Sequence, residues 1–345
     1  MRTSFAEAIR GALFAEMERD PSVFVYGIGV PDFKGIFGTT LGLAERFGVD
    51  RCFDTPISED AMTGFALGAA LKGLKPVHTH IRADFLMLSM NQIVNMISCH
   101  AYETGGRFPL PIVIRAIIGR GWGQGAQHSK SLFSYFTHIP GLKVVVPTTP
   151  TDARDLLTAS IRDPNPVIFL EHRWLHWIED DVPDVMEVDP LGKAKILRQG
   201  DAITVVGTSW MNVEAMHAAG VLAENGIEIE VIDPRTLSPL DIDTIAASVN
   251  RTGLCLIADF DWVDSGFSAE ITARLHEACF DRLKAPIRRL GFAHVPCPTV
   301  RSLENLFYPN SETIIRTVEE MIGHGPIDLG DVDFYSHERR FHGPF

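Results

Sequence analysis

Short apolar runs alternate with amphipathic stretches along most of the chain. A short apolar run fits a strand buried on both faces, and apolar residues three or four apart fit one face of a helix. The predicted strands cover residues 23–26, 51–54, 76–81, 111–118, 143–147, 167–171, 203–207, 227–233, 254–259 and 287–290. The predicted helices cover residues 3–18, 41–47, 61–70, 86–104, 151–162, 213–225, 241–249, 268–279 and 314–322. This alternation predicts an α/β fold with doubly wound parallel sheets.

One stretch, residues 173–192, interrupts the alternation with prolines and acidic residues, and it is predicted to be a linker,. We therefore expect two doubly wound domains, at residues 1–172 and 193–323,. Residues 324–345 carry aromatic side chains without any periodicity, namely Phe334, Tyr335, Phe341 and Phe345. We expect this tail to dock on a partner subunit, with disorder as the alternative.

The charge balance argues against two classes of partner. With 31 lysines and arginines against 44 aspartates and glutamates, the net charge is −13. A surface of that sign disfavours nucleic acid and anionic membranes as partners. No apolar run reaches the length of a membrane span, no targeting leader is evident, and the five cysteines lack metal-ligand spacing,. We therefore expect a cytoplasmic protein with reduced thiols.

Residues 52–85 combine a strand–helix–strand pattern with a candidate catalytic group. Glu59 lies where the first turn becomes a helix rich in alanine and glycine. Such a thin helix allows a second backbone, a subunit or a flat ligand to approach closely. Burial would raise the pKa of the Glu59 carboxyl group, because desolvation disfavours its charged form, and the protonated group can donate a hydrogen bond. The alternative is an acid that only complements the helix dipole, behind Ser58 as the N-cap.

The residues around Glu59 also resemble the signature of one enzyme family. Phe53-Asp54-Thr55-Pro56-Ile57-Ser58-Glu59 is similar to the motif of the beta subunits of thiamine diphosphate-dependent 2-oxoacid dehydrogenases, the decarboxylase components of the pyruvate, branched-chain and acetoin complexes. Further matching segments follow in the family's order, at 73–76, 83–85, 91–95, 127–129, 138–147, 166–171 and 233–240. The resemblance covers residues 4–322 and implies a pyrimidine-binding domain followed by a transketolase C-terminal-like domain.

The resemblance implies that thiamine diphosphate is the cofactor and that this chain contacts its aminopyrimidine ring. Glu59 matches the glutamate that hydrogen-bonds a ring nitrogen and so activates the cofactor. Phe85 matches the residue that packs on the ring. Ile57 and Ile81 match apolar neighbours of the ring, with core packing as an equal alternative. His128, in a glycine-rich loop, matches a histidine that meets the substrate and the acyl-accepting arm.

The resemblance also implies partners. The family motif for the diphosphate and its magnesium, of the Gly-Asp-Gly…Asn type, does not occur in this sequence. An alpha subunit is therefore expected to hold both, in an assembly of two alpha and two beta subunits. A lipoyl acyltransferase core is a further partner in the family. The carbonyl of Ile112, with Asp163 and Asn165, matches a structural potassium site of relatives, although the residues alone indicate an ordinary turn,.

Three positions depart from the family pattern. Ala126 stands where many bacterial relatives have a second loop histidine, Trp122 is unusual in the loop, and Asp259 ends a strand that often ends in histidine. The first two keep open a carboligase or acyl transferase of specialised metabolism, whose acceptor is a carbonyl compound instead of lipoamide. A non-catalytic assembly subunit is a third hypothesis. The presence of Glu59, Phe85 and His128 together argues against that third hypothesis, and a 2-oxoacid dehydrogenase beta subunit is the leading one. Its choice of 2-oxoacid is expected to depend on side chains from two subunits.

Overall fold

The computed structural model describes residues 2–119, 123–186, 188 and 190–334. These residues form two compact units. The first unit comprises the described residues up to 119, those between 135 and 191, and the segment 236–239, while the second comprises the others. Loop residues 123–134 therefore belong to the second unit, although they precede part of the first unit in sequence.

The main sheet of the first unit is parallel except at one edge. Across the described residues its order is β12 (Thr236–Ser238), β6 (Lys143–Val145), β7 (Val167–His172), β5 (Val113–Ile118), β4 (Lys75–His80), β2 (Val23–Tyr26) and β3 (Cys52–Phe53). β12 runs antiparallel to β6, and the other neighbours are parallel. Every residue of β5 and β7 is buried, as expected for strands covered on both faces.

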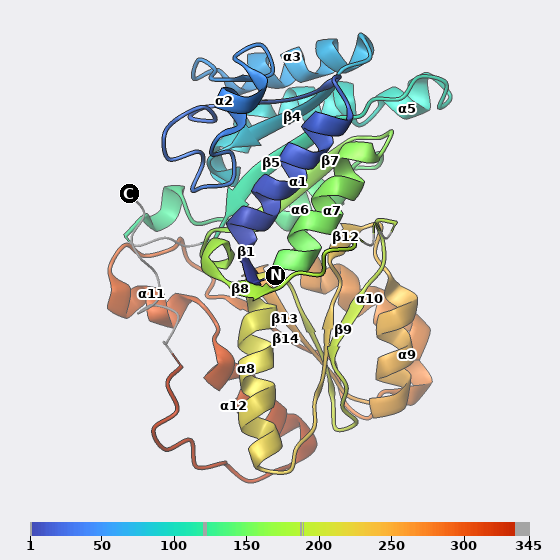
Figure 1. The fold of residues 1–345 in the computed structure, drawn as a ribbon. Coiled ribbons are helices and arrows are strands. Elements are labelled where there is room, and N and C mark those ends of the chain that lie inside the picture. The colour runs from blue at the N-terminus through green and yellow to red at the C-terminus, as the bar shows by residue number, and fades with distance from the viewer. Residues whose placement is uncertain (1, 120–122, 187, 189, 335–345) are drawn as a thin grey trace. The chain divides into compact units, whose positions relative to one another are not determined.

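Helices pack against this sheet. α1 (Phe5–Arg19) and α7 (Pro150–Arg162) lie side by side in front of it in Figure 1. α1 begins with a capping box formed by Ser4 and Glu7, and α7 begins with Thr149 as its N-cap,. Other elements of the unit are α2 (Leu43–Phe47), α3 (Glu59–Leu71), η4 (Arg173–Trp177) and the paired β1 (Arg2–Ser4) and β8 (Glu179–Asp181). The stretch expected to be a linker, 173–192, thus contributes η4 and β8 to the first unit.

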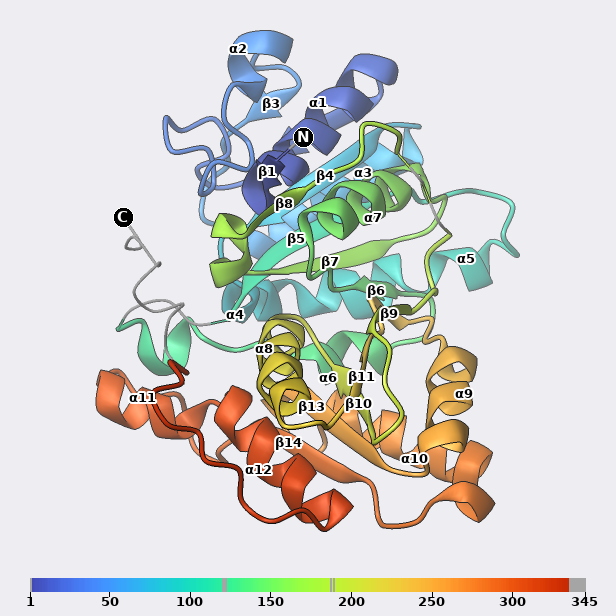
Figure 2. The same ribbon diagram turned by 60° about the horizontal axis from the view of Figure 1, so that its bottom comes forward.

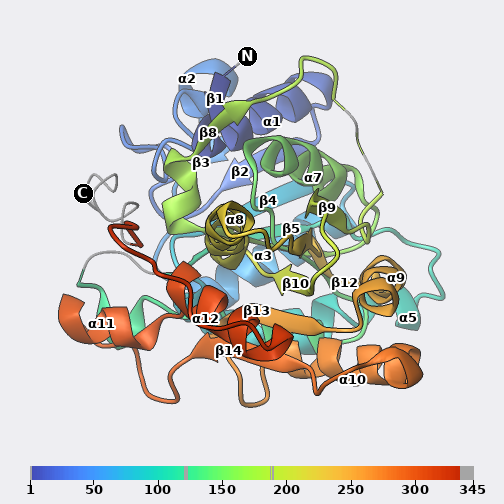
Figure 3. The same ribbon diagram turned by 90° about the horizontal axis from the view of Figure 1, so that it is seen from below.

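The second unit repeats the architecture with a smaller sheet. Its order across the described residues is β14 (Arg288–Phe292), β13 (Cys255–Trp262), β10 (Thr204–Gly207), β11 (Glu230–Asp233) and the antiparallel β9 (Lys195–Arg198). α8 (Trp210–Glu224) lies beside α12 (Ser311–Ile322), and α9 (Ile242–Thr252) lies beside α10 (Phe267–Cys279), as Figure 2 and Figure 3 show. The remaining elements are η3 (Gly125–Gln127), η5 (Phe280–Arg282) and α11 (Arg301–Phe307), together with the first two residues of α6 (Phe133–Thr137), whose other residues belong to the first unit.

Both units therefore confirm the doubly wound α/β class predicted from the alternation of strands and helices,. No helix in the described part of the chain is long and apolar enough to cross a membrane.

Residues 83–103 follow a helical path of changing pitch, which corrects the single helix expected over 86–104. The segments are α4 (Ala83–Leu86), the 3-10 turn η1 (Met87–Ser89), the π-helical η2 (Asn91–Ile97) and α5 (His100–Glu103). The hydroxyl of Ser98 and the thiol of Cys99 both donate to the carbonyl of Val94, while the N–H of Ser98 reaches back to Ile93. The side chains compete for the carbonyl that an α-helix would use, and this favours the wider turn.

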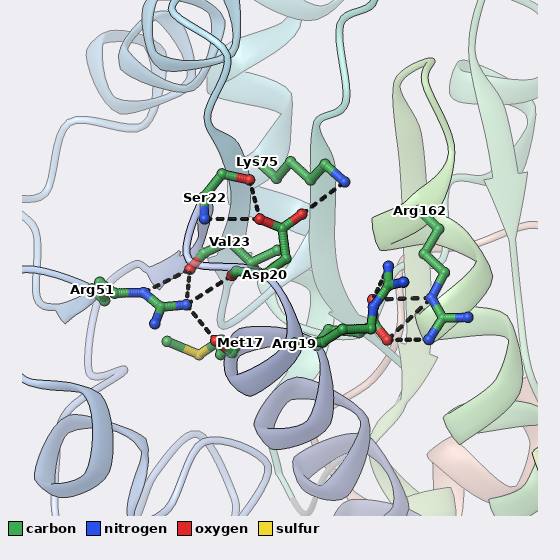
Figure 4. A network of polar contacts seen from close by, with 9 residues as sticks. Met17, Arg19, Asp20, Ser22, Val23, Arg51, Lys75 and Arg162 are labelled. Carbon is green, nitrogen blue, oxygen red and sulfur yellow. Dashed lines mark hydrogen bonds and ion pairs between the residues drawn. The ribbon is translucent and has the colours of Figure 1, made fainter.

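A polar network fixes the beginnings of three strands relative to α1. Figure 4 shows the guanidinium of Arg51, just before β3, donating to main-chain carbonyls between the end of α1 and β2. Asp20 pairs with Lys75 at the start of β4, with 3.0 Å between nitrogen and oxygen. Buried Glu16 of α1 accepts hydrogen bonds from Arg162 of α7. The opposite ends of the same strands, where the candidate residues lie, are thereby held in register.

The beginning of the C-terminal tail packs on the second unit. Ile327, Leu329 and Phe334 are buried. The N–H of Ile327 donates to the Glu319 carboxylate of α12 at 2.6 Å, and the rings of Phe334 and His217 have centroids 5.9 Å apart. Three aromatic residues of the tail, Tyr335, Phe341 and Phe345, lie outside the described residues. One of the four aromatic side chains expected to meet a partner thus packs within its own chain.

Candidate cofactor site

The candidate residues of the first unit lie at the carboxyl edge of its sheet. β3 and β4 both run parallel to β2, so the segments that follow them leave the sheet at the same edge. Residues 54–58 lead from β3 into α3, and residues 81–86 follow β4. Open parallel sheets bind their ligands at this edge. Glu59, Ile81 and Phe85 are therefore carried by the exits of two strands of one sheet.

Glu59 is the first residue of α3, and its side chain is half-buried. Ser58 occupies the N-cap position, but its side chain makes no capping hydrogen bond. A first-turn carboxylate complements the helix dipole in this position. The carboxyl group also stays partly open to a ligand, so its place in the fold is compatible with both interpretations of the sequence.

Apolar side chains on the same two strand exits are exposed to solvent or only half-buried. Ile57 is 83% exposed and Phe85 is 40% exposed, while Ile81 is half-buried. Ile57 is therefore not a core residue of this chain, which removes core packing as the explanation for it. Exposed apolar side chains of this size suit a flat ligand ring or the surface of a partner.

The small residues of α3 permit a close approach, as the sequence predicted, and part of that approach is made by the chain itself. An added Cβ at Gly64 would lie 3.4 Å from the amide oxygen of Gln92 in η2. Gln92 in turn donates to Asp60 at 3.3 Å. At Gly68 an added Cβ would meet open space. The helix thus packs closely on η2 at one position and offers a side-chain-free surface at another.

A buried polar cluster locks α3 to β4 and η1. Thr63, one turn beyond Glu59, donates to the Ser89 hydroxyl at 2.9 Å and lies 3.4 Å from Nδ1 of His78. Nε2 of His80 lies 3.2 Å from the same Nδ1. Burial lowers the pKa of both imidazoles, to about 3 for His80. Both rings are therefore neutral near pH 7, and the cluster can position α3 without introducing charge.

Sequence reasoning missed two buried arginines at the same edge. Nη1 of Arg82, directly after β4, donates to the carbonyl of Gly119 at 3.1 Å. The guanidinium of Arg173, directly after β7, lies 3.2 Å from the ring centroid of Phe37. Burial and the charge of Arg82 lower the pKa of Arg173 to about 9. The only signal in the sequence is a basic residue at the end of an apolar strand, a pattern that equally fits an exposed loop.

His128 lies in the second unit, half-buried, after the turn η3. The loop is tightly packed at Gly125, where an added Cβ would come within 2.6 Å of the Thr299 hydroxyl oxygen. Ala126 is exposed. Trp122 lies outside the described residues. The loop that carries His128 is therefore attached to the second unit by packing that only glycine permits at position 125.

Asp259 is a structural anchor in the second unit. It is fully buried in β13, which continues to Trp262, beyond the expected strand end. Its carboxyl oxygens accept from the Thr208 hydroxyl at 2.8 Å and from the N–H of Ser268 at 2.9 Å. Burial raises the pKa of this carboxyl group. The departure from histidine at this position thus places a hydrogen-bond acceptor at the start of α10.

The residues matched to a potassium site form a tight turn. The Asp163 carboxylate pairs with Lys143 and accepts from the N–H of Asn165 at 2.9 Å. The carbonyl of Ile112 accepts from the N–H of Val167 at 2.9 Å, which leaves it a second lone pair,. The Asp163 carboxylate is thus already paired, while the Ile112 carbonyl keeps an unshared lone pair,. In the described part of the chain, no group of three or more His, Cys, Asp or Glu side chains could hold a metal ion.

Comparison with known families gives two matches that together span most of the chain. Residues 2–176 match the family described as the transketolase pyrimidine binding domain. Residues 192–314 match the transketolase C-terminal domain. Among solved structures, a split-gene transketolase described as an inactive beta4 tetramer superposes with a TM-score of 0.72 over 93% of this chain and 98% of its own. At 21% identity, that likeness shows the fold.

Curated relatives of similar length are closer in sequence. The pyruvate dehydrogenase E1 component subunit beta of Rickettsia bellii is 40% identical over 321 residues, which are 93% of this chain and 99% of the relative. The acetoin:2,6-dichlorophenolindophenol oxidoreductase subunit beta of Cupriavidus necator is 40% identical over 94% of this chain and 98% of its own. The mitochondrial pyruvate dehydrogenase E1 component subunit beta-1 of Arabidopsis thaliana is 41% identical over 90% of this chain and 86% of its own.

Proposed function

Because this chain belongs to the transketolase-like beta subunits of thiamine diphosphate-dependent 2-oxoacid dehydrogenases, we propose that it supplies the pyrimidine-binding half of the cofactor site. The observation that carries the proposal is the grouping of Glu59, Ile81 and Phe85 on the exits of two parallel strands. Exposed Ile57 and Phe85, on the same strand exits as a half-buried carboxyl group, fit an aromatic ring that bears nitrogen atoms.

When bound, thiamine diphosphate supplies the carbanion chemistry that decarboxylation of a 2-oxoacid requires. In the proposal, Glu59 holds a proton between its carboxyl oxygen and a nitrogen of the aminopyrimidine ring. Phe85 and the two isoleucines orient the ring and exclude water. Cofactor and partner would together cover the half-buried carboxyl group and exclude water from it,. The cofactor site is thus expected to be complete only in the assembled enzyme.

We assign the diphosphate and magnesium to an alpha-type subunit, because the corresponding family motif does not occur in this sequence. The proposed assembly has two alpha and two beta subunits. A lipoyl acyltransferase core is the proposed acyl-accepting partner, and His128 is proposed to meet the substrate and the acyl arm. We place the enzyme in the cytoplasm, consistent with five free cysteines,. A potassium ion at the turn of Ile112, Asp163 and Asn165 would have a structural role and no part in the reaction.

A carboligase of specialised metabolism is the second candidate function. It is favoured by exposed Ala126 in the loop, where the usual second histidine would stand. A loop with one imidazole fewer has less proton-transfer capacity for a lipoyl acceptor. A lipoyl domain and an aldehyde, offered as competing acceptors, would distinguish the two enzymes by their products.

The experiment that tests the proposal is carbon dioxide release from a panel of 2-oxoacids. The chain is co-expressed with an alpha-type subunit and supplied with thiamine diphosphate and magnesium. Wild type is compared with Glu59→Gln and with Asp60→Asn, the adjacent first-turn acid, as a matched control. Loss of about 10²–10⁴ in turnover only in Glu59→Gln is expected from lost acid–base help. Equal turnover in all three proteins would favour a non-catalytic assembly subunit.

A further inference from the structure

The loop that carries His128 is bound at its end by a buried carboxylate. Asp261 lies in β13 with 4% of its surface exposed. Its Oδ2 accepts from the main-chain N–H of Phe133 at 3.0 Å, and it also accepts from the N–H of Leu132. Its Oδ1 accepts from the N–H of Trp262 at 2.9 Å. Two of these three bonds are made to the backbone where the loop ends and α6 begins.

The backbone that Asp261 binds is in an unfavourable conformation. Leu132 has a φ of +60°, in the left-handed region that branched side chains rarely adopt, and it is buried. Such a conformation persists only where the surroundings determine it. Asp261 supplies that constraint through the N–H groups on both sides of the Leu132 Cα, and Gly125 packs on Thr299 at the other end of the loop. His128 lies between these two attachments.

Burying a carboxyl group at position 261 costs free energy of folding. Burial and the nearby negative charge of Asp259 raise the pKa of Asp261 to about 7. An apolar side chain of similar size would avoid that cost. It would, however, leave the buried N–H groups of Leu132 and Phe133 without their acceptor. The need to accept hydrogen bonds from these two loop N–H groups therefore explains why a carboxyl group occupies position 261.

We propose that Asp261 is a positioning residue that fixes loop residues 123–133 and thereby places His128 for the substrate. The inference rests on the role proposed above for His128, and it names the group that holds this histidine in place. Asp261 acts through main-chain hydrogen bonds and takes no part in bond making or breaking.

The test uses the assembled enzyme with its alpha-type subunit and compares three variants with wild type. Asp261→Ala removes the acceptor, while Asp261→Asn keeps one carbonyl oxygen for Phe133. Asp259→Asn is the matched control, because it lies two residues away on the same strand and is equally buried, but binds Thr208 and Ser268 instead of the loop. Hydrogen exchange of peptides within 123–134 reports loop order. The KM for the 2-oxoacid and the affinity for thiamine diphosphate report function.

In Asp261→Ala we expect loop amides to exchange about tenfold faster or more, as loss of hydrogen bonds to a buried acceptor implies. The KM for the 2-oxoacid should rise about tenfold with cofactor affinity unchanged, and Asp261→Asn should restore part of both effects. Asp259→Asn should speed exchange at the start of α10 and leave the loop and KM unchanged.

Equal loop exchange in the Asp261 variants and in Asp259→Asn would overturn the inference, and so would a loosened loop with an unchanged KM. His128→Ala separates this inference from the proposed function. If His128→Ala keeps the wild-type KM, the proposed role of His128 is wrong, whatever the loop exchange shows. If His128→Ala raises KM while both Asp261 variants match wild type, the positioning role alone is wrong. Should Asp261→Ala fail to assemble, Asp261→Asn supplies the same comparison.

Discussion

At the scale of single residues, Asp20 shows a carboxylate that the fold stabilises in its charged form. Hydrogen bonds from Ser22 and the nearby Lys75 lower the pKa of Asp20 to about 2. A depressed pKa contributes stability above the unfolded value of 3.8, and that contribution is lost as the pH falls towards 2,.

Asp20→Asn should therefore lower the free energy of unfolding by about 2 kcal/mol at pH 7. The difference from wild type should shrink between about pH 4 and pH 2, because both proteins are then uncharged at this position. Urea unfolding at several pH values measures it, with the exposed Asp50→Asn as the control. A difference that does not change with pH would show that the charge is not responsible.

The pKa of Asp261 is shifted in the opposite direction from that of Asp20. Its pKa is raised to about 7 by burial and by Asp259. The native state keeps this proton at pH values where the unfolded chain has released it, so the contribution to stability is present below about pH 4 and is lost as the pH rises through about 7. Asp261→Asn should flatten the pH dependence of unfolding between these values, as measured by urea midpoints at pH 5 and pH 8. Identical slopes in both proteins would contradict the account.

The residues of the candidate site differ in how far sequence could identify them. Glu59 was placed at a helix start by local pattern, and the structure has it there. The exposure of Ile57 was not predictable, because an isoleucine next to a strand is expected to be buried in the core unless its spatial neighbours are known,. Arg82 and Arg173 were missed because burial of a charge after a strand depends on loops distant in sequence.

At the scale of elements, the polar cluster of Thr63, His78, His80 and Ser89 holds α3 in place. Thr63→Val keeps the shape of the side chain but removes the hydroxyl that reaches both Ser89 and His78. The free energy of unfolding should fall by about 1–3 kcal/mol, because buried polar groups lose a partner. Thermal unfolding measures the loss. Thr104→Val, whose hydroxyl bonds within its own helix at a less buried site, should cost less than half as much.

Elements that sequence reasoning missed are short or lie at sheet edges. β9 and β12 each form the antiparallel edge of a sheet, and edge strands carry polar residues that break the apolar pattern. The helix expected over 86–104 divides into turns of different pitch because Ser98 and Cys99 bond to a carbonyl of the helix. Periodicity detects the apolar face of a helix but not this competition.

At the scale of the whole molecule, the alternation of elements was enough to predict two doubly wound units. It did not predict which unit holds loop residues 123–134 or the segment 236–239. Those assignments depend on tertiary contacts, such as the pairing of β12 with β6 and the bond between Asp261 and Phe133. Periodicity likewise predicts no structure in the tail, although Ile327 and Phe334 are buried, with Ile327 bonded to Glu319 of α12 and Phe334 packed near His217 of α8.

A shared cofactor site has a direct consequence for binding. The isolated chain should bind thiamine diphosphate at least about 100-fold more weakly than the complex with the alpha-type subunit, because the diphosphate contacts are missing. Removing magnesium with a chelator should weaken binding to the complex and leave the isolated chain unaffected. Isothermal titration calorimetry of both forms measures this. Tight binding by the chain alone, with or without magnesium, would refute a site divided between subunits.

The most direct test of the central claim is exchange of the thiazolium C2 proton of bound thiamine diphosphate for deuterium in the assembled complex. This measurement is independent of which 2-oxoacid is the substrate. If Glu59 activates the aminopyrimidine, exchange in Glu59→Gln should be slower than in wild type by about 10²–10⁴, with cofactor occupancy equal and Asp60→Asn unchanged. Equal exchange rates in wild type and Glu59→Gln, at equal occupancy, would contradict the account.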